Sequence, residues 1–272
     1  MRNIGIMIGG RADKDFEAEF KKATDLGISS CQISIWDQKL HNDDFISGIK
    51  SAVEKTGFSI SGIWGGYSGP CEWNFQYGPS TIGLVPQGYR GQRVEDLLRA
   101  SETAYKLGVQ NIITHVGFMP ENPNDPDYAG TISALRYICR ALKARGQNFL
   151  FETGQETPVV LLRAIEDIGT DNVGVNLDTG NLILYGKANP VDALDVIGKY
   201  VMDTHFKDGN YPTDGKFLGK ECCAGEGKAN IPEVVRKLEA LGYTGPFTIE
   251  REISGEKQVR DIIIARDLIL NA

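Results

Sequence analysis

The feature that most constrains the fold is the regular alternation of short strand-like runs with amphipathic helical segments. The strand-like runs are residues 3–9, 29–36, 58–64, 111–117, 148–153, 173–178, 200–206 and 246–250. The segments between them carry apolar residues at helical spacing, as in Phe16, Phe20 and Ala23. Such alternation is typical of a parallel sheet built from repeated strand–helix units.

Glycines mark the ends of the expected helices. One stands shortly before each of the last seven strand-like runs, at Gly27, Gly57, Gly108, Gly146, Gly169, Gly198 and Gly242. Glycine in the left-handed conformation is the commonest way to end a helix. With a final helix over residues 256–270, the chain predicts a single-domain (β/α)8 TIM barrel, an α/β fold spanning residues 1–272. A doubly wound open sheet is the alternative, but no G-x-G-x-x-G turn follows the first strand.

Charge and composition limit the classes of partner. The 272 residues include 36 acidic and 29 basic side chains, a formal net charge of -7, which disfavours broad contact with nucleic acid. No apolar run is long enough to span a membrane, the N-terminus lacks signal-peptide features, and the five cysteines show no C-x-x-C spacing. We therefore expect a cytoplasmic protein with no nucleic-acid or membrane partner. A homo-oligomer is compatible with the sequence.

Chemically useful side chains end five consecutive predicted strands. In a (β/α)8 barrel the active site lies at the carboxyl ends of the strands. The residues there are His115, Glu152, Asp178, His205 and Glu250. Helix capping would explain Asp178, but glutamate is a weak N-cap, so capping explains Glu152 and Glu250 poorly. The pattern therefore predicts a functional site.

Four of these residues form a candidate metal-binding set. Glu152, Asp178, His205 and Glu250 would supply carboxylate oxygens and one imidazole nitrogen. This donor set suits Mn²⁺ best, with Mg²⁺, Co²⁺ or Zn²⁺ as alternatives. A structural zinc site would use thiolates, and no cysteine stands at these strand ends.

Four motifs carry a resemblance to a known family. FETGQE (151–156), NLDTGN (176–181), THFKD (204–208) and TIERE (248–252) resemble the strand-end motifs of the xylose-isomerase-like TIM barrels. That sugar (phosphate) isomerase/epimerase family includes ketose 3-epimerases and hydroxypyruvate isomerase. The resemblance implies that Glu152, Asp178, His205 and Glu250 bind one divalent metal, and that Glu152 and Glu250 are the catalytic proton-transfer pair. The chain departs from ketose 3-epimerases at Asn181, where they carry histidine, and in loop 207–229, which has no arginine.

The predicted function is a metal-dependent isomerase or epimerase of a sugar or sugar derivative. The metal would bind a carbonyl, and a glutamate would move a proton at the neighbouring carbon. Two alternatives remain open. The same site could drive β-elimination from 3-keto-glycosides as a lyase, or the protein could be a non-catalytic sugar-binding barrel.

Further residues are candidates for binding the sugar. His115 and Asn181 would hydrogen-bond its hydroxyls, and Trp36 and Trp64 would contact its carbon face; the alternative for the tryptophans is packing on the barrel rim. Glu156 and Lys207 would orient substrate or metal ligands; the alternatives are a helix-dipole charge for Glu156 and an ion-paired or solvated side chain for Lys207. The long segment 65–91 is expected to be a loop without secondary structure, and loops of this length are usually functional lids or disordered segments.

Overall fold

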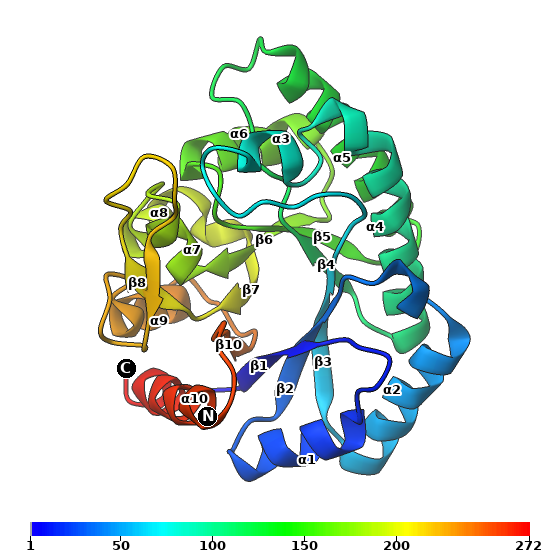
Figure 1. Ribbon diagram of the computed structural model, residues 1–272, viewed down its shortest axis with the longest axis vertical. Helices are drawn as coiled ribbons and strands as arrows, with labels where there is room; N and C mark the ends of the chain where they lie inside the picture. The colour runs from blue at the N-terminus through cyan, green and yellow to red at the C-terminus, as the bar shows by residue number, and fades with distance from the viewer. Residues whose placement is uncertain (1) are drawn as a thin grey trace.

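The computed structural model describes residues 2–272 and confirms the predicted barrel (Figure 1). Eight parallel strands lie side by side in the order β10-β1-β2-β3-β4-β5-β6-β7. Their bounds are β1 Ile4–Gly9, β2 Ser30–Ile35, β3 Ser59–Gly65, β4 Asn111–Thr114, β5 Asn148–Glu152, β6 Val173–Asp178, β7 Val201–His205 and β10 Phe247–Ile249. A separate two-stranded hairpin, β8 Asp208–Asn210 and β9 Lys220–Cys222, follows β7.

The last pair of strands nearly closes the barrel. A parallel bridge joins Phe206, just after β7, to Ile249 of β10. The Phe206 N–H donates to the Thr248 carbonyl oxygen at 2.6 Å, and the Glu250 N–H donates to the Phe206 carbonyl oxygen at 3.2 Å. These bonds bring the chain after β10 beside the chain after β7, which places Glu250 next to His205 and Lys207.

Helices surround the strands and cover their outer face. They are α1 Phe16–Asp25, α2 Asp43–Thr56, α3 Gly78–Thr81, α4 Gln87–Leu107, α5 Pro126–Lys143, α6 Pro158–Ile168, α7 Thr179–Leu184, α8 Pro190–Ile197, α9 Ile231–Ala240 and α10 Glu256–Leu270. The large hydrophobic core lies between helices and strands, as in the stacked rings of Phe20 and Phe58, whose centroids are 4.7 Å apart. Trp64, Ile113 and Leu150 form a second, small cluster from neighbouring strands. In the described residues no helix is long and apolar enough to cross a membrane.

The structure corrects three expectations from the sequence. Strand β4 ends at Thr114, so His115 is the first residue after the strand. Gly198 has φ -57° instead of a left-handed value, because α8 continues directly into the 3-10 turn Gly198–Tyr200. Segment 65–91 is not unstructured, since it contains α3 and the first residues of α4.

A buried arginine holds segment 65–91 in place. The Arg93 guanidinium donates hydrogen bonds to the carbonyl oxygens of Ser68, Pro70 and Gly83, at 2.6 to 3.0 Å. It also stacks against Tyr67 and Tyr89, 4.4 and 4.7 Å from their ring centroids. An arginine can satisfy three carbonyl groups at once because its guanidinium is a rigid fork of donors. The segment is therefore a fixed wall.

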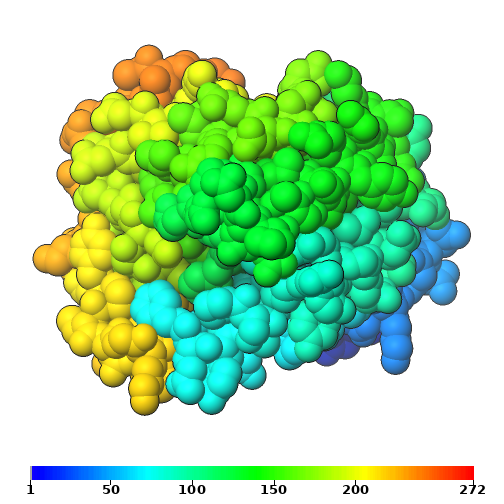
Figure 2. Space-filling model, turned by 90° about the horizontal axis from the view of Figure 1, so that it is seen from above, coloured from blue at the N-terminus to red at the C-terminus, as the bar shows by residue number. Residues whose placement is uncertain are grey.

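Two loops meet above one side of the barrel mouth. The Phe75 N–H in segment 65–91 donates to the Lys216 carbonyl oxygen in the β8–β9 hairpin at 2.9 Å. Figure 2 shows the two segments side by side, in cyan and yellow. Residues far apart in the sequence thus share the rim of the mouth.

Candidate active site

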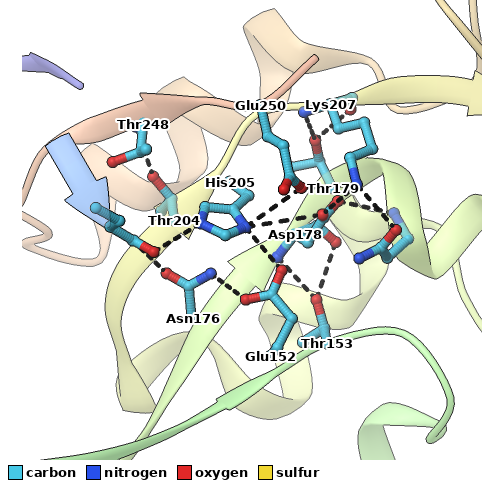
Figure 3. A network of polar contacts seen from close by, with 12 residues as sticks. Glu152, Thr153, Asn176, Asp178, Thr179, Thr204, His205, Lys207, Thr248 and Glu250 are labelled. Carbon is cyan, nitrogen blue, oxygen red and sulfur yellow. Dashed lines mark hydrogen bonds and ion pairs between the residues drawn. The ribbon is translucent and has the colours of Figure 1, made fainter. Parts of the chain in front are cut away.

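The four candidate metal ligands lie together at the carboxyl end of the barrel (Figure 3). Glu152, Asp178 and His205 are the last residues of β5, β6 and β7, and Glu250 directly follows β10. One ligand atom from each lies within 4.8 Å of the others. Three of the side chains are buried, while that of Glu250 is 18% exposed. Parallel strands converge at this end, so the sequence pattern brings the four groups together as predicted.

His205 directs one ring nitrogen toward the carboxylates. Its Nδ1 is 2.8 Å from Glu152 Oε1, 3.5 Å from Glu250 Oε2 and 4.0 Å from Asp178 Oδ2. The other nitrogen, Nε2, is 2.7 Å from the side-chain oxygen of Gln32 on β2. The imidazole is thus fixed at both edges.

A chain of amide groups determines which nitrogen carries the proton. Glu152 Oε2 accepts from the Asn176 amide, whose oxygen accepts from Gln32 Nε2 at 2.8 Å. Because an ionised carboxylate can only accept, both amides must point their oxygens away from Glu152. Gln32 Oε1 then accepts from the N–H of His205 Nε2. Burial lowers the pKa of His205, but the Glu152 and Glu250 carboxylates outweigh burial and raise it well above its usual value. Once Nδ1 gives up its proton, the ring keeps the Nε2 proton on Gln32 and has a lone pair on Nδ1, as a metal ligand requires.

Asp178 has two separate roles in the structure. Its Oδ1 accepts the Asn181 backbone N–H at 2.8 Å and caps α7. Its Oδ2 is buried and has no hydrogen-bond partner among residues 2–272, although Lys207 Nζ is 3.2 Å away in ion-pair range. Capping and ligation are therefore compatible, since each uses a different oxygen.

Lys207 is an ion-paired side chain. Its Nζ lies 2.7 Å from Glu250 Oε2 and 2.6 Å from Glu252 Oε1, and it donates to the Asn181 side-chain oxygen at 3.3 Å. Burial lowers the pKa of the ammonium group, but the Asp178 and Glu250 carboxylates outweigh burial and hold it well above its usual value. The ion-paired alternative is thus the arrangement observed.

The donor set fits one divalent ion. Three carboxylates and one imidazole converge, and Asp178 Oδ2, which accepts no hydrogen bond among residues 2–272, is a buried oxygen of the kind a cation would satisfy. Such an oxygen-rich set with a single nitrogen is typical of sites for Mn²⁺ and Mg²⁺. A buried Glu/Asp/His cluster of this kind can hold a metal.

A cavity of about 310 Å³, here called the substrate cavity, opens beside the cluster. Its lining residues are Met7, Ser34, Trp36, Trp64, Trp73, His115, Glu152, Asn181, Leu184, Tyr185, Leu218, Glu250 and Glu252. The Trp36 and Trp64 rings are 5.0 Å apart by their centroids. His115 is buried, its Nδ1 lacks a hydrogen-bond partner within the described chain, and burial lowers its pKa. A neutral His115 can therefore bond a ligand hydroxyl.

Glu156 does not line this cavity. It is buried, and neither carboxyl oxygen has a hydrogen-bond partner in the described part of the chain. Burial raises its pKa to about 8. At neutral pH the group is mostly protonated, which weakens its interpretation as a charge on a helix dipole.

Sequence reasoning missed Gln32 and Asn176. Both are fully buried polar side chains on strands, and they link His205 to Glu152. The available signal was a polar residue at an interior position of the strand-like runs SSCQISIW and VGVNLD. An amide in such a run must find a partner, because an unpaired buried amide is destabilising.

Comparisons with known proteins agree with this architecture. Residues 20–266 match the family model of the xylose isomerase-like TIM barrels. A xylose isomerase domain protein from Planctomyces limnophilus has 30% identity and a TM-score of 0.91, covering 99% of this chain and 96% of that one. The 3-keto-D-glucoside 4-epimerase of E. coli shares the fold, with a TM-score of 0.75 and 16% identity over 100% of both chains.

A further relative is an uncharacterised protein of Methanocaldococcus jannaschii. It is 28% identical over 187 residues, which are 65% of this chain and 60% of that protein. The match thus spans less than two thirds of the relative's length.

Proposed function

Because the chain belongs to the xylose isomerase-like TIM barrel family, we propose that it is a divalent-metal-dependent isomerase or epimerase of a sugar or sugar derivative. The observation that carries the proposal is the convergence of Glu152, Asp178, His205 and Glu250 at the barrel mouth, beside a cavity of monosaccharide scale. The similar E. coli protein, an epimerase of a keto-glucoside, supports this class of reaction.

The metal would be held by the four clustered side chains. His205 would contribute Nδ1 and Asp178 would contribute Oδ2, since their other polar atoms are already bonded. Mn²⁺ is our first candidate, with Mg²⁺, Co²⁺ or Zn²⁺ as alternatives. When bound, the ion would polarise a substrate carbonyl and acidify the adjacent C–H.

Glu152 and Glu250 are the proposed proton-transfer pair. Both line the substrate cavity, and they come from β5 and β10, which are not neighbours in the barrel. One carboxylate would remove the proton and the other would return it on the opposite face, giving an epimer. Return of the proton to the neighbouring carbon would instead interconvert an aldose and a ketose.

The remaining lining residues would position the sugar. The His115 ring and the Asn181 amide face the cavity as hydrogen-bond groups for hydroxyls. Trp36 and Trp64 offer apolar rings for the carbon face of the sugar. Lys207 would orient Glu250 through their 2.7 Å ion pair. Glu156, which is buried and does not line the cavity, would help to orient the groups that bind the substrate or the metal.

The test is deuterium exchange into a panel of ketoses and keto-glycosides in D₂O, with protein loaded with Mn²⁺, Mg²⁺, Co²⁺ or Zn²⁺. Exchange at the carbon next to the carbonyl, lost on metal removal, is the expected result. Release of aglycone from 3-keto-glycosides without exchange into free ketoses would indicate the lyase. Sugar binding without exchange or release across the panel would indicate a non-catalytic barrel.

A further inference from the structure

Glu250 differs from the other three candidate metal ligands in how the barrel holds it. Glu152, Asp178 and His205 are the last residues of strands of five or six residues, whereas Glu250 follows the three-residue strand β10. The pairing of β10 with β1 stops at the residue before Glu250, and residues 250–254 have no secondary structure. The position of the Glu250 carboxylate therefore depends on contacts made by the chain that follows β10.

The next residue, Arg251, joins that chain to two other elements. Its Nη1 lies 2.8 Å from Glu221 Oε2 on β9, and its Nε donates to Asp261 Oδ2 on α10 at 2.8 Å. The three side chains are nearly buried, with exposed fractions of 9% for Arg251, 13% for Glu221 and 7% for Asp261. The guanidinium therefore bridges the β8–β9 hairpin and α10 from the residue beside Glu250.

Two backbone groups beside the Arg251 side chain are bound by the same elements. The Glu252 N–H donates to Glu221 Oε1 at 3.2 Å, so this one carboxylate binds both the guanidinium and the backbone of the following residue. The Gln258 side chain, in the first turn of α10, donates to the Arg251 carbonyl oxygen at 2.9 Å. Residues 251 and 252 are thus attached to β9 and to α10 through both side chain and backbone.

Stability alone is a weak explanation for this buried ion triplet of Arg251, Glu221 and Asp261. Removing charged groups from water has a desolvation cost, and apolar side chains of similar volume often stabilise a protein equally well or better. The directional hydrogen bonds of a rigid guanidinium, in contrast, fix the relative positions of the groups that they join. The triplet occurs where no strand pairing orients a proposed catalytic residue.

We propose that Arg251 is a positioning residue, which fixes Glu250 for metal binding and proton transfer by tying the chain after β10 to the β8–β9 hairpin and to α10. This inference rests on the proposed function, in which Glu250 is both a metal ligand and one of the proton-transfer pair. Arg251 does not line the substrate cavity, so it acts through the backbone that it shares with Glu250.

Titration with Mn²⁺ and crystal structures of the metal-free proteins test this role without any sugar. Arg251→Met loses both ion pairs, and we expect the Glu250 carboxylate to leave the position in which its Oε2 lies 3.5 Å from His205 Nδ1. The affinity for Mn²⁺ should fall about tenfold, as is typical when a group that orients a metal ligand is lost. Combining Arg251→Met with Glu221→Gln and Asp261→Asn leaves no unpaired buried carboxylate, and this triple variant replaces the single one if that folds poorly.

A double-mutant cycle separates positioning from a general structural role. In a Glu250→Gln background the tenfold effect of Arg251→Met should disappear, because that background already lacks the carboxylate that Arg251 positions. Arg2→Met is the matched control. Arg2 also pairs with a glutamate, Glu239 at 2.7 Å, and bonds carbonyl oxygens at the end of α10, but it precedes β1 at the other end of the barrel. Its loss should leave Mn²⁺ affinity unchanged.

Two outcomes would overturn the positioning role. One is that Glu250 keeps its position, or that Mn²⁺ binds with wild-type affinity, in the variants that lack both ion pairs. The other is that Arg251→Met lowers the affinity equally in the wild-type and Glu250→Gln backgrounds. Failure of the proposed function has a different signature: Arg251→Met would still displace Glu250 and weaken Mn²⁺ binding, while no sugar in the deuterium-exchange panel reacts.

Discussion

The two halves of the barrel mouth are built in different ways. The acidic half consists of Glu152, Asp178, His205 and Glu250 at the ends of β5, β6, β7 and β10. The aromatic half consists of Trp64, near the end of β3, and of Trp36, Tyr67 and Trp73, which follow β2 and β3. In the acidic half, polar contacts of fixed direction orient side chains on rigid strands. In the aromatic half, contacts between rings and the three hydrogen bonds of the Arg93 guanidinium shape segment 65–91.

The two halves therefore meet different geometric requirements. Groups that must converge on one point within a fraction of an ångström lie at strand ends, while most of the groups that define the outline of the cavity lie on connecting segments. Gln32 links the two halves, because it lies on β2 of the aromatic half and its side chain hydrogen-bonds to His205 and Asn176 of the acidic half.

The largest effect is expected from Asp178→Asn. Asparagine can still cap α7, so the fold should persist while one charged metal ligand is lost. We expect sugar turnover to fall at least about 10³-fold and metal affinity to fall about 100-fold or more. Metal titration and deuterium exchange would measure both.

Asp15→Asn is the matched control, because Asp15 caps α1 outside the site through Ala18 N–H. It should leave metal affinity and turnover unchanged. Normal metal binding by Asp178→Asn would remove Asp178 from the acidic half as a ligand.

The next largest effect is expected from Gln32→Leu. The change leaves His205 Nε2 and the Asn176 oxygen unpaired, so the ring loses its fixed tautomer and orientation. We expect metal affinity to fall about 10- to 100-fold and stability to fall by about 1 to 3 kcal/mol. Isothermal metal titration and chemical unfolding would measure the two effects.

Gln147→Leu separates positioning from stability. Gln147 is another buried glutamine, bonded to Ser101 and Val109 away from the mouth. Its loss should lower stability similarly and leave metal affinity intact. Equal loss of affinity in both variants would show that Gln32 acts only through folding.

A smaller effect, confined to the aromatic half, is expected from Arg93→Lys. Lysine cannot reach three carbonyl groups, so segment 65–91 should loosen. We expect a stability loss of about 2 kcal/mol and a roughly tenfold rise in KM, with metal affinity unchanged. Arg136→Lys is the control, since Arg136 also bonds backbone carbonyl oxygens, those of Asp167 and Ile168, away from the mouth. A fall in metal affinity in Arg93→Lys would mean that the two halves are not separable.

The smallest effect on metal affinity and turnover is expected from Glu156→Gln, which changes stability alone and does so only at high pH. The folded-state pKa of Glu156 is raised to about 8 from a usual 4.5, so the stability it contributes at low pH is lost as pH rises through that range. Glutamine cannot ionise, so the variant should be more stable than the wild type by about 2 to 4 kcal/mol at pH 8.5 and similar at pH 5. Thermal unfolding across this range would measure the difference. A pH-independent difference would contradict a buried, protonated Glu156.

The sequence predicted the barrel and the convergence of the four polar groups for a simple reason. Strand order places Glu152, Asp178 and His205 on adjacent strands, and parallel strands share one carboxyl end. To predict that the groups converge, it is enough to know that each one stands at the carboxyl end of its strand. The alternation of strand-like runs with helical segments shows where each strand ends. The roles of these residues in binding metal and moving protons remain predictions.

The polar network could not be predicted in the same way. Gln32 and Asn176 are 144 residues apart, and their contact depends on closure of the barrel and on side-chain conformations. The Lys207 side chain could have pointed toward solvent or toward the carboxylates. Its ion pairs with Glu250 and Glu252, which form only in the folded barrel, determine its orientation. At Gly198 the local residue preference favoured a left-handed helix end, but the continuing 3-10 turn prevailed.

The double use of Asp178 couples two events at the mouth. One oxygen holds the first turn of α7, and that helix and the residue after it carry Asn181, Leu184 and Tyr185 to the wall of the substrate cavity. A cation drawing on the other oxygen would therefore also fix the position of that wall. Thermodynamic reciprocity then requires that a sugar binding the ordered wall tighten the hold on the cation by the same factor.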